Sequence, residues 1–149
     1  MTLTRSGFII EQISEPSEIE RALAIRHAVF VEEQGVPLNM EIDEHDYANA
    51  IHFLGRLQGQ PVATARLCLM DGVAKIQRVA VLIEARGGGH GAALVAHLVA
   101  YAKTNRLAPV IALDSQTHAT GFYERLGFAT TGEPFDDAGI MHIRMEMTI

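Results

Sequence analysis

The amino-acid sequence predicts a mixed α/β (α+β) fold with a mostly antiparallel central sheet flanked by helices. Consecutive strand-like runs separated by short turns occupy residues 51–83, which is typical of an antiparallel meander. A glycine-rich loop and a helical pattern follow, and then a continuous apolar run at 110–113 that is typical of a buried parallel strand. The predicted order is β-α-(α)-β-β-β-α-β-α-β-β, and the 149 residues fit a single domain, 1–149.

The first elements expected are a short strand at Phe8–Ile10 and a helix after it. Ser17 and Glu20 have the spacing of a capping box, which predicts that the helix begins there. Apolar residues at helical spacing continue the pattern to about Val31, before Gly35 interrupts it. This helix is expected to bury one face against the sheet.

Three central strands are expected at residues 51–57, 62–70 and 73–83. Asp71-Gly72 is a strong signal for a two-residue hairpin turn, because both residues tolerate the positive φ that such a turn requires. The second and third of these strands are therefore expected to pair antiparallel.

The second half of the chain alternates helices and strands. Apolar residues at helical spacing over 94–102 predict a helix that ends before Pro109. The apolar strand at 110–113 is then reached by a crossover connection and should pair parallel. The remaining elements are expected at 119–126 (a helix stopped by Gly127), 128–131 and 140–148 (two closing strands).

Charge and hydropathy exclude several classes of function. The formal net charge of −6 leaves no basic face for a phosphate backbone, so no nucleic-acid partner is expected. No apolar run is long enough to span a bilayer and residues 1–6 lack the apolar core of a signal peptide, so we expect no membrane partner and a cytoplasmic location.

The single cysteine, Cys68, is expected to be a buried hydrophobic residue. The histidines lack metal-ligand spacing, so we expect no metal.

The loop that follows the third central strand reads Arg-Gly-Gly-Gly-His-Gly (86–91) and leads into a helix. Backbone N–H groups at a helix N-terminus bind anions, and glycines allow a phosphate to approach them closely. The loop matches neither a Walker loop nor a dinucleotide-binding fingerprint. A phosphate-bearing ligand other than a hydrolysed nucleotide is therefore favoured.

In this position, the Arg-x-x-Gly-x-Gly spacing at 86–91 resembles the coenzyme loop of the GNAT superfamily of N-acetyltransferases. The segment Phe-Tyr-Glu-Arg-Leu-Gly-Phe at 122–128 is similar to that family's Phe-Tyr-x-x-x-Gly-Phe, and 76–81 resembles the strand that precedes the loop. The run at 26–34, with Glu41, Asp43 and Asp46 after it, is similar to the ElaA-like branch.

The resemblance implies an acetyl-CoA-dependent enzyme that transfers an acetyl group to a primary amine of a small molecule or peptide, by direct attack in a ternary complex. It implies that Tyr123 is the general acid that protonates the leaving thiolate; the alternative is an amphipathic core tyrosine. The backbone N–H groups near residues 79–81 are expected to polarise the thioester carbonyl. The implied coenzyme-binding residues are Val79, Ala80, Val81, Arg86, Gly87, Gly88, Gly89, His90, Gly91, Ala92 and Phe122.

Titratable side chains gather before the first central strand. They are Glu33, Glu41, Asp43, Glu44, His45 and Asp46. One interpretation is an electronegative cleft that attracts a cationic amine, and the other is a solvated loop. The candidates for substrate binding are Glu33, Glu41, Asp43 and His142, although a structural role for His142 is the alternative. The sequence does not assign the general base.

Two other functions fit parts of the sequence. A non-catalytic acyl-CoA sensor would keep the fold without the chemistry. The residues at 26–33, with Glu41 and Asp43, also resemble the N-terminal signature of acyl-homoserine-lactone synthases, which are usually longer and lack the Arg-x-x-Gly-x-Gly loop. Edge strands near the C-terminus make a homodimer possible.

Overall fold

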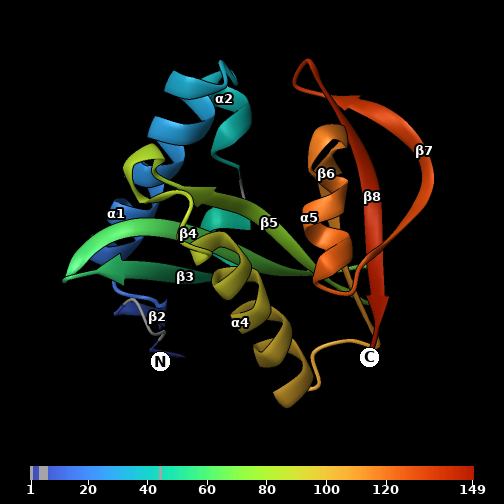
Figure 1. The fold of residues 1–149 in the computed structure, drawn as a ribbon, viewed down its shortest axis with the longest axis horizontal. Helices are drawn as coiled ribbons and strands as arrows, with labels where there is room; N and C mark the ends of the chain where they lie inside the picture. The colour runs from blue at the N-terminus through green and yellow to red at the C-terminus, as the bar shows by residue number, and fades with distance from the viewer. Residues whose placement is uncertain (1, 4–6, 44) are drawn as a thin grey trace.

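A computed structural model describes residues 2–3, 7–43 and 45–149 of the chain (Figure 1). Its strands form one eight-stranded sheet in the order β1-β2-β3-β4-β5-β6-β8-β7. The strands are β1 (Thr2–Leu3), β2 (Phe8–Ile13), β3 (Ala50–Leu57), β4 (Gln60–Met70), β5 (Val73–Val81), β6 (Val110–Gln116), β7 (Ala129–Asp137) and β8 (Ile140–Thr148). The helices are α1 (Pro16–Arg26), the π-helix η1 (His27–Glu33), α2 (Leu38–Glu41), α3 (His45–Ala48), the 3₁₀ turn η2 (Ile83–Ala85), α4 (His90–Thr104), the 3₁₀ turn η3 (Thr117–Ala119) and α5 (Thr120–Arg125).

The predicted fold class is confirmed. β2 to β5 pair antiparallel in sequence order, β5 and β6 pair parallel, and β6, β8 and β7 are antiparallel again. The hairpin turn at Asp71-Gly72 joins β4 to β5 as expected, with positive φ at both residues. In the described ranges, no helix is long and apolar enough to cross a membrane.

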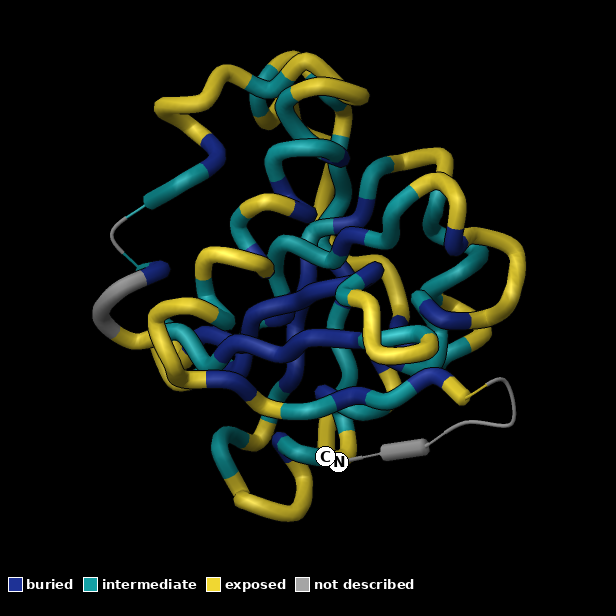
Figure 2. The backbone as a smooth tube through the Cα atoms, turned by 90° about the vertical axis from the view of Figure 1, so that its left-hand side faces the viewer, coloured by how far each residue is buried: buried dark blue, intermediate teal, exposed yellow. Residues whose placement is uncertain are grey.

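Apolar side chains bury both faces of the sheet, so its central strands lie inside the molecule (Figure 2). On one face, Leu94 and Leu98 of α4 pack with Phe53 of β3. On the other face, Ala22 and Ile25 of α1 pack with the next residue of β3, Leu54, because successive side chains of a strand point in opposite directions. The two helices therefore fix the sheet from its two sides.

The sheet opens between β5 and β6. The two strands pair over only three positions, from Val73–Val110 to Lys75–Ala112, and then diverge. Figure 1 shows β5 with the strands on one side of this opening and β6, β8, β7 and α5 on the other. A bulge in β5 adds to the divergence: Arg78 has φ +57°, and the register against β4 shifts there. The opening creates room for ligands between two halves of one continuous sheet.

Several local predictions were wrong. The first helix begins at Pro16, with no side-chain cap at Glu15, because proline supplies the φ of the first helical turn and needs no N–H partner. The helix does not continue as an α-helix to Val31 but widens into the π-helix η1. The strand expected to reach residue 83 ends at Val81. β6 and β7 are longer than expected, because β8 pairs along them beyond their apolar residues.

Candidate active site

The first of two adjoining cavities lies over the N-terminus of α4 and has a volume of about 480 Å³. It is lined by Val29, Gln34, Val79, Ala80, Val81, Ala85, Arg86, Gly87, Gly89, His90, Gly91, Ala92 and Phe122. Every residue expected to bind the coenzyme lines this cavity except Gly88. Four separate segments meet there: η1 with Gln34 directly after it, the end of β5, the glycine-rich loop and α5.

The glycine-rich loop presents backbone to the cavity. Gly87 and Gly89 have φ of +89° and +79°, and a Cβ at either position would meet no atom within 4 Å. The first intrahelical hydrogen bond of α4 runs from the Ala93 N–H to the Gly89 carbonyl. The N–H groups of residues 90–92 therefore have no partner within the helix, as expected for the first helical turn. This arrangement fits the diphosphate of a coenzyme, because amides and open space meet at one point.

The ring of His90 turns away from the loop surface. It is 7% exposed and packs on the Phe8 ring at a centroid distance of 4.4 Å. A Cβ on Gly88 would lie 2.8 Å from Nε2 of His90, which explains a glycine at 88 by packing. His90 thus offers its backbone amide to the cavity and uses its ring to hold the loop against β2.

Arg86 and Glu33 form an exposed bidentate ion pair, with two N–O distances of 2.7 Å. Nε of Arg86 also donates to the Val81 carbonyl at 2.9 Å. The hydrogen bonds from Arg86 lower the pKa of Glu33 and keep it ionised. Glu33, a candidate for substrate binding, therefore lies at the end of η1 with its carboxylate paired to the glycine-rich loop.

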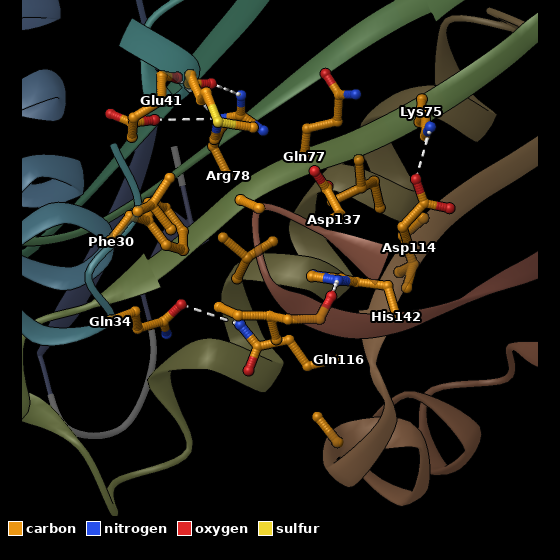
Figure 3. A pocket seen from close by; sticks show the side chains of 18 of the residues that line it. Phe30, Gln34, Glu41, Lys75, Gln77, Arg78, Asp114, Gln116, Asp137 and His142 are labelled. Carbon is orange, nitrogen blue, oxygen red and sulfur yellow. Dashed lines mark hydrogen bonds and ion pairs between the residues drawn. The ribbon is translucent and has the colours of Figure 1, made fainter. Parts of the chain in front are cut away.

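The second cavity, of about 310 Å³, fills the opening between β5 and β6 (Figure 3). Its lining residues are Phe30, Gln34, Val36, Met40, Glu41, Lys75, Ile76, Gln77, Arg78, Val79, Leu113, Asp114, Gln116, Ala119, Tyr123, Asp137, Ala138, Ile140 and His142. Gln34 and Val79 line both cavities, so the cavities meet at these two residues, which we call the junction. A hydrogen bond of 3.0 Å from Gln116 Nε2 to Gln34 Oε1 bridges the opening at the junction.

Tyr123 projects into the second cavity from α5, while its neighbour Phe122 lines the first. The Tyr123 ring packs edge-on against Phe122 and Phe128, at centroid distances of 4.9 and 6.3 Å. Burial raises the pKa of the Tyr123 hydroxyl, so it stays protonated at neutral pH. Tyr123 therefore lines the second cavity as a protonated phenol whose ring is held by Phe122 and Phe128.

Ion pairs occupy much of the polar lining of the second cavity. Lys75 and Asp114 lie 2.8 Å apart across the opening. The Glu41 carboxylate accepts hydrogen bonds from Arg26 and Arg78. Asp137 lies at the end of β7, and His142 projects from β8 (Figure 3).

The acidic segment before β3 belongs to a buried ion network. Arg26 binds Glu41 and Asp46, and Arg66 binds Asp43 and Asp46, with N–O distances of 2.5 to 2.7 Å. Arg26 and Arg66 are each 1% exposed. Three arginines (with Arg78) balance three carboxylates, and within the described ranges no buried side-chain polar atom lacks a hydrogen-bond partner. The network ties α2 and α3 to α1, β4 and β5, and so holds the wall of the second cavity formed by Met40 and Glu41.

Hydrogen bonding sets the protonation of this network. Burial alone would raise the pKa of Asp46, but hydrogen bonds from Arg26, from the Asp43 backbone N–H and from Arg66 hold that pKa well below its ordinary range. Burial is likewise outweighed at Asp43, where Arg66 lowers the pKa. Burial lowers the pKa of His52, which contacts the Asp46 carbonyl and is therefore neutral at pH 7. Asp43 and Asp46 are therefore ionised at neutral pH, as are their partners Arg26 and Arg66, whose pKa values burial would lower but these carboxylates raise.

The acidic candidates are thus separated by the structure. Glu41 lines the second cavity with its carboxylate already paired, Asp43 lies in the ion network, and Glu33 lies beside the loop. Neither a cleft of free carboxylates nor a solvated loop describes this segment, and Glu44 lies outside the described residues. His142 does line the second cavity.

Sequence reasoning missed Gln34, Gln116, Asp114 and Asp137. Asp114 and Gln116 follow the apolar run at 110–113 from which the strand was predicted, so they were not assigned to it. The signal that could have found them is their spacing of two residues, which places both side chains on the same face of a strand. Gln34 ends the run at 26–34 that resembles the ElaA-like branch, but nothing in the sequence marked it as a cavity residue, and no sequence pattern included Asp137.

The site thus consists of two adjoining cavities, one lined by the glycine-rich loop and one lined mainly by side chains of β5, β6 and β8, which meet at the junction. A family model described as an acetyltransferase (GNAT) domain matches residues 18–149. The chain therefore belongs to the GNAT acetyltransferase family and is an acyltransferase.

Individual relatives support this assignment. A Bacillus subtilis (strain 168) protein named as an acetyltransferase is 37% identical over 138 residues, covering 91% of this chain and 93% of that protein. ElaA of Escherichia coli (strain K12) is 32% identical over 133 residues, covering 87% of this chain and 86% of ElaA. The crystal structure of ElaA has a TM-score of 0.85 to this chain, with 28% identity, covering 93% of this chain and 98% of ElaA. A crystal structure titled as an N-acetyltransferase from Lactobacillus plantarum has a TM-score of 0.87 and 30% identity, covering 95% and 97%. The predicted likeness to ElaA is confirmed.

GNAT enzymes generally use acetyl-CoA as a cosubstrate. Among the described residues, no group of three or more histidine, cysteine, aspartate or glutamate side chains is placed to hold a metal ion.

Proposed function

We propose that the protein is an N-acetyltransferase that binds acetyl-CoA in the first cavity and a primary amine, of a small molecule or a peptide, in the second. The observation that carries this proposal is the junction, where Gln34 and Val79 line both cavities. Two substrates bound on either side of it would meet there, and positioning of this kind supplies much of an enzyme's rate. A chain with a single, buried cysteine needs no oxidising compartment, which supports action in the cytoplasm.

In this proposal, some residues of the two cavities bind acetyl-CoA and others transfer protons. Amides of residues 90–92 and the Arg86 guanidinium would hold the diphosphate, and backbone N–H groups of residues 79–81 would stabilise negative charge on the carbonyl oxygen. Acetyl-CoA supplies an activated thioester, whose C–S bond breaks as the amine nitrogen forms the C–N bond. Tyr123 gives its hydroxyl proton to the departing sulfur and regains one from solvent. The attacking nitrogen loses a proton to a base in the second cavity, so the products are an N-acetyl amide and free coenzyme A.

Replacing Gly89 by aspartate is expected to abolish acetyl-CoA binding and acetyl transfer. The new side chain would enter the first cavity, its carboxylate would repel the diphosphate, and φ +79° is unfavourable for any residue with a Cβ. Calorimetry with acetyl-CoA measures binding, and release of free thiol in the presence of a panel of amines measures transfer.

Gly59→Asp is the matched control, because Gly59 has φ +80° and open space around it in the β3–β4 turn. It should cost a similar strain and leave binding unchanged. If wild-type protein binds acetyl-CoA but no amine of the panel causes thiol release, acetyl transfer is contradicted and the sensor function is favoured. Binding that survives in Gly89→Asp would contradict the placement of the coenzyme.

Replacing Arg86 and replacing Glu33 should change the affinity for acetyl-CoA in opposite directions. Arg86→Ala removes a charge-assisted contact and should raise the Kd of acetyl-CoA by about tenfold. Glu33→Gln removes a competing negative charge and frees Arg86, so the Kd should fall. Calorimetry at low and high ionic strength tests this, since salt should reduce both shifts. If both variants shift the Kd of acetyl-CoA equally and in the same direction, the ion pair only stabilises the loop and Arg86 does not contact the coenzyme.

A further inference from the structure

We infer that His142 is the general base that takes the proton from the attacking amine. The inference rests on the proposed function and adds to it the residue that the mechanism leaves unassigned. It depends on three observations: the tautomer of His142, its neighbours in the sheet and the pairing of the other titratable groups in the cavity.

The tautomer of His142 is fixed by a backbone contact. Nδ1 lies 2.8 Å from the carbonyl oxygen of Ile140. A carbonyl oxygen only accepts hydrogen bonds, so Nδ1 carries the hydrogen in the neutral ring. The lone pair is then on Nε2, the nitrogen that a base needs. A backbone partner therefore prepares His142 to accept a proton in the second cavity, which the ring lines.

The position of His142 in the sheet brings its ring toward the junction. His142 is the direct cross-strand partner of Gln116, so the two side chains share one face of the sheet. Gln116 in turn bonds to Gln34 at the junction. On the other side, Phe135 is paired with His142 on β7, and its ring stacks at a centroid distance of 6.1 Å. The imidazole is thus held between a stacked ring and the place where the two substrates would meet.

The other titratable groups of the cavity are less suitable as the base. They are Glu41, Lys75, Arg78, Asp114, Tyr123 and Asp137. Glu41 accepts hydrogen bonds from two arginines, and Asp114 is paired with Lys75. Asp137 pairs with Ile140, which is two positions before His142 on β8, so its backbone lies roughly 7 Å along the strand from the His142–Gln116 pair. Asp137 is the one rival among these groups.

The proton balance follows from this placement. Nε2 of His142 takes one proton from the ammonium group of the substrate, which frees the nitrogen lone pair to form the C–N bond, and the ring becomes an imidazolium. The nitrogen loses its second proton to solvent as the amide forms, and Tyr123 delivers a different proton to the departing sulfur. His142 then releases its proton to solvent, and the ring returns to the tautomer set by Ile140.

The test compares His142→Gln with wild type for kcat/KM of acetyl transfer between pH 6 and 10. At pH 7, the variant should lose about 100-fold in kcat/KM, with the Kd of acetyl-CoA unchanged. Its rate should then rise about tenfold per pH unit, as free amine replaces ammonium, and approach the wild-type rate near pH 10. A merely structural loss would not recover with pH. Imidazole added to His142→Ala should restore part of the rate.

His118→Gln is the matched control, because His118 is exposed on η3 and is not among the residues that line either cavity. Asp137→Asn tests the rival. A His142→Gln rate that stays near wild type at pH 7, or a larger loss in Asp137→Asn with the same recovery at high pH, would overturn the inference. If wild type itself transfers no acetyl group to any amine, the proposed function fails instead, and the two failures are therefore distinguishable.

Discussion

Replacing Tyr123 by phenylalanine is expected to lower kcat for acetyl transfer about 100-fold, which is the low end of what a general acid contributes. Tyr123 lines the second cavity, and burial raises the pKa of its hydroxyl, so the hydroxyl carries a proton at the pH of the reaction. Without it, the departing thiolate must take a proton from water. The ring contacts with Phe122 and Phe128 are kept by phenylalanine, so the Kd of acetyl-CoA should be nearly unchanged. Steady-state kinetics and calorimetry measure the two quantities separately.

Tyr101→Phe is the matched control for this prediction. Tyr101 packs edge-on against Phe53 on the α4 face of the sheet and is not among the residues that line the two cavities. Its kcat should equal that of wild type. If Tyr123→Phe also keeps its kcat, Tyr123 is the amphipathic core residue that the sequence allowed, and the proton reaches sulfur through water.

The pH dependence of kcat gives a second measurement of the same role. A general acid must be protonated, so kcat should fall as pH rises through the pKa of Tyr123. Because burial raises that pKa, the fall should begin above the ordinary tyrosine value near 10. The alkaline fall should be absent in Tyr123→Phe.

Local signals predicted the parts of this fold that depend on a few neighbouring residues. The Asp71-Gly72 turn needs two positive φ angles, and both residues adopt them. The apolar run at 110–113 predicted the parallel strand, because a strand covered on both faces is apolar throughout. The glycines at 87 and 89 similarly predicted where backbone would face a ligand.

The π-helix η1 at 27–33 was predicted as a continuation of the α-helix, because the two kinds of helix have nearly the same residue pattern. Its wider turns are seen in the bond from the Gln34 N–H to the Val29 carbonyl, five residues back. This widening changes which side chains face the sheet at the end of the helix. Gln34 thereby reaches the junction, and Glu33 reaches Arg86.

The ion network was missed for a different reason. Polar and acidic residues usually indicate a solvated segment, and here the segment is buried because its partners come from distant parts of the chain. Arg26 and Asp46 are 20 residues apart, and Arg66 lies another 20 residues beyond. No spacing rule links such residues. The similarity of 26–34, Glu41, Asp43 and Asp46 to the ElaA-like branch was the available signal, and the network gives a physical reason for much of that pattern.

Replacing Asp46 by asparagine is expected to destabilise the protein by about 3–5 kcal/mol at pH 7, as is usual when one partner of a buried ion pair is removed. Asp46 bonds both Arg26 and Arg66, so the change leaves two buried cations with one carboxylate fewer. For a domain of this size, the loss corresponds to a fall in Tm of roughly 6–20 °C. Thermal unfolding followed by circular dichroism measures it. Asp71→Asn, in the exposed β4–β5 turn, is the matched control, since asparagine also tolerates the positive φ found there.

The same pair of proteins should respond differently to acid. The folded-state pKa of Asp46 is lowered, so its contribution to stability is fully present above the unfolded value near 3.9 and is lost as pH falls toward the folded value. The Tm difference between wild type and Asp46→Asn should therefore be constant from pH 7 to about 5 and shrink below pH 4. Neutral His52 adds a loss of stability below about pH 6.5, because its buried ring resists protonation. A Tm difference that is small at pH 7, or that grows as the pH falls below 4, would mean that the carboxylate does not hold Arg26 and Arg66 together, and that packing alone supports the wall of the second cavity.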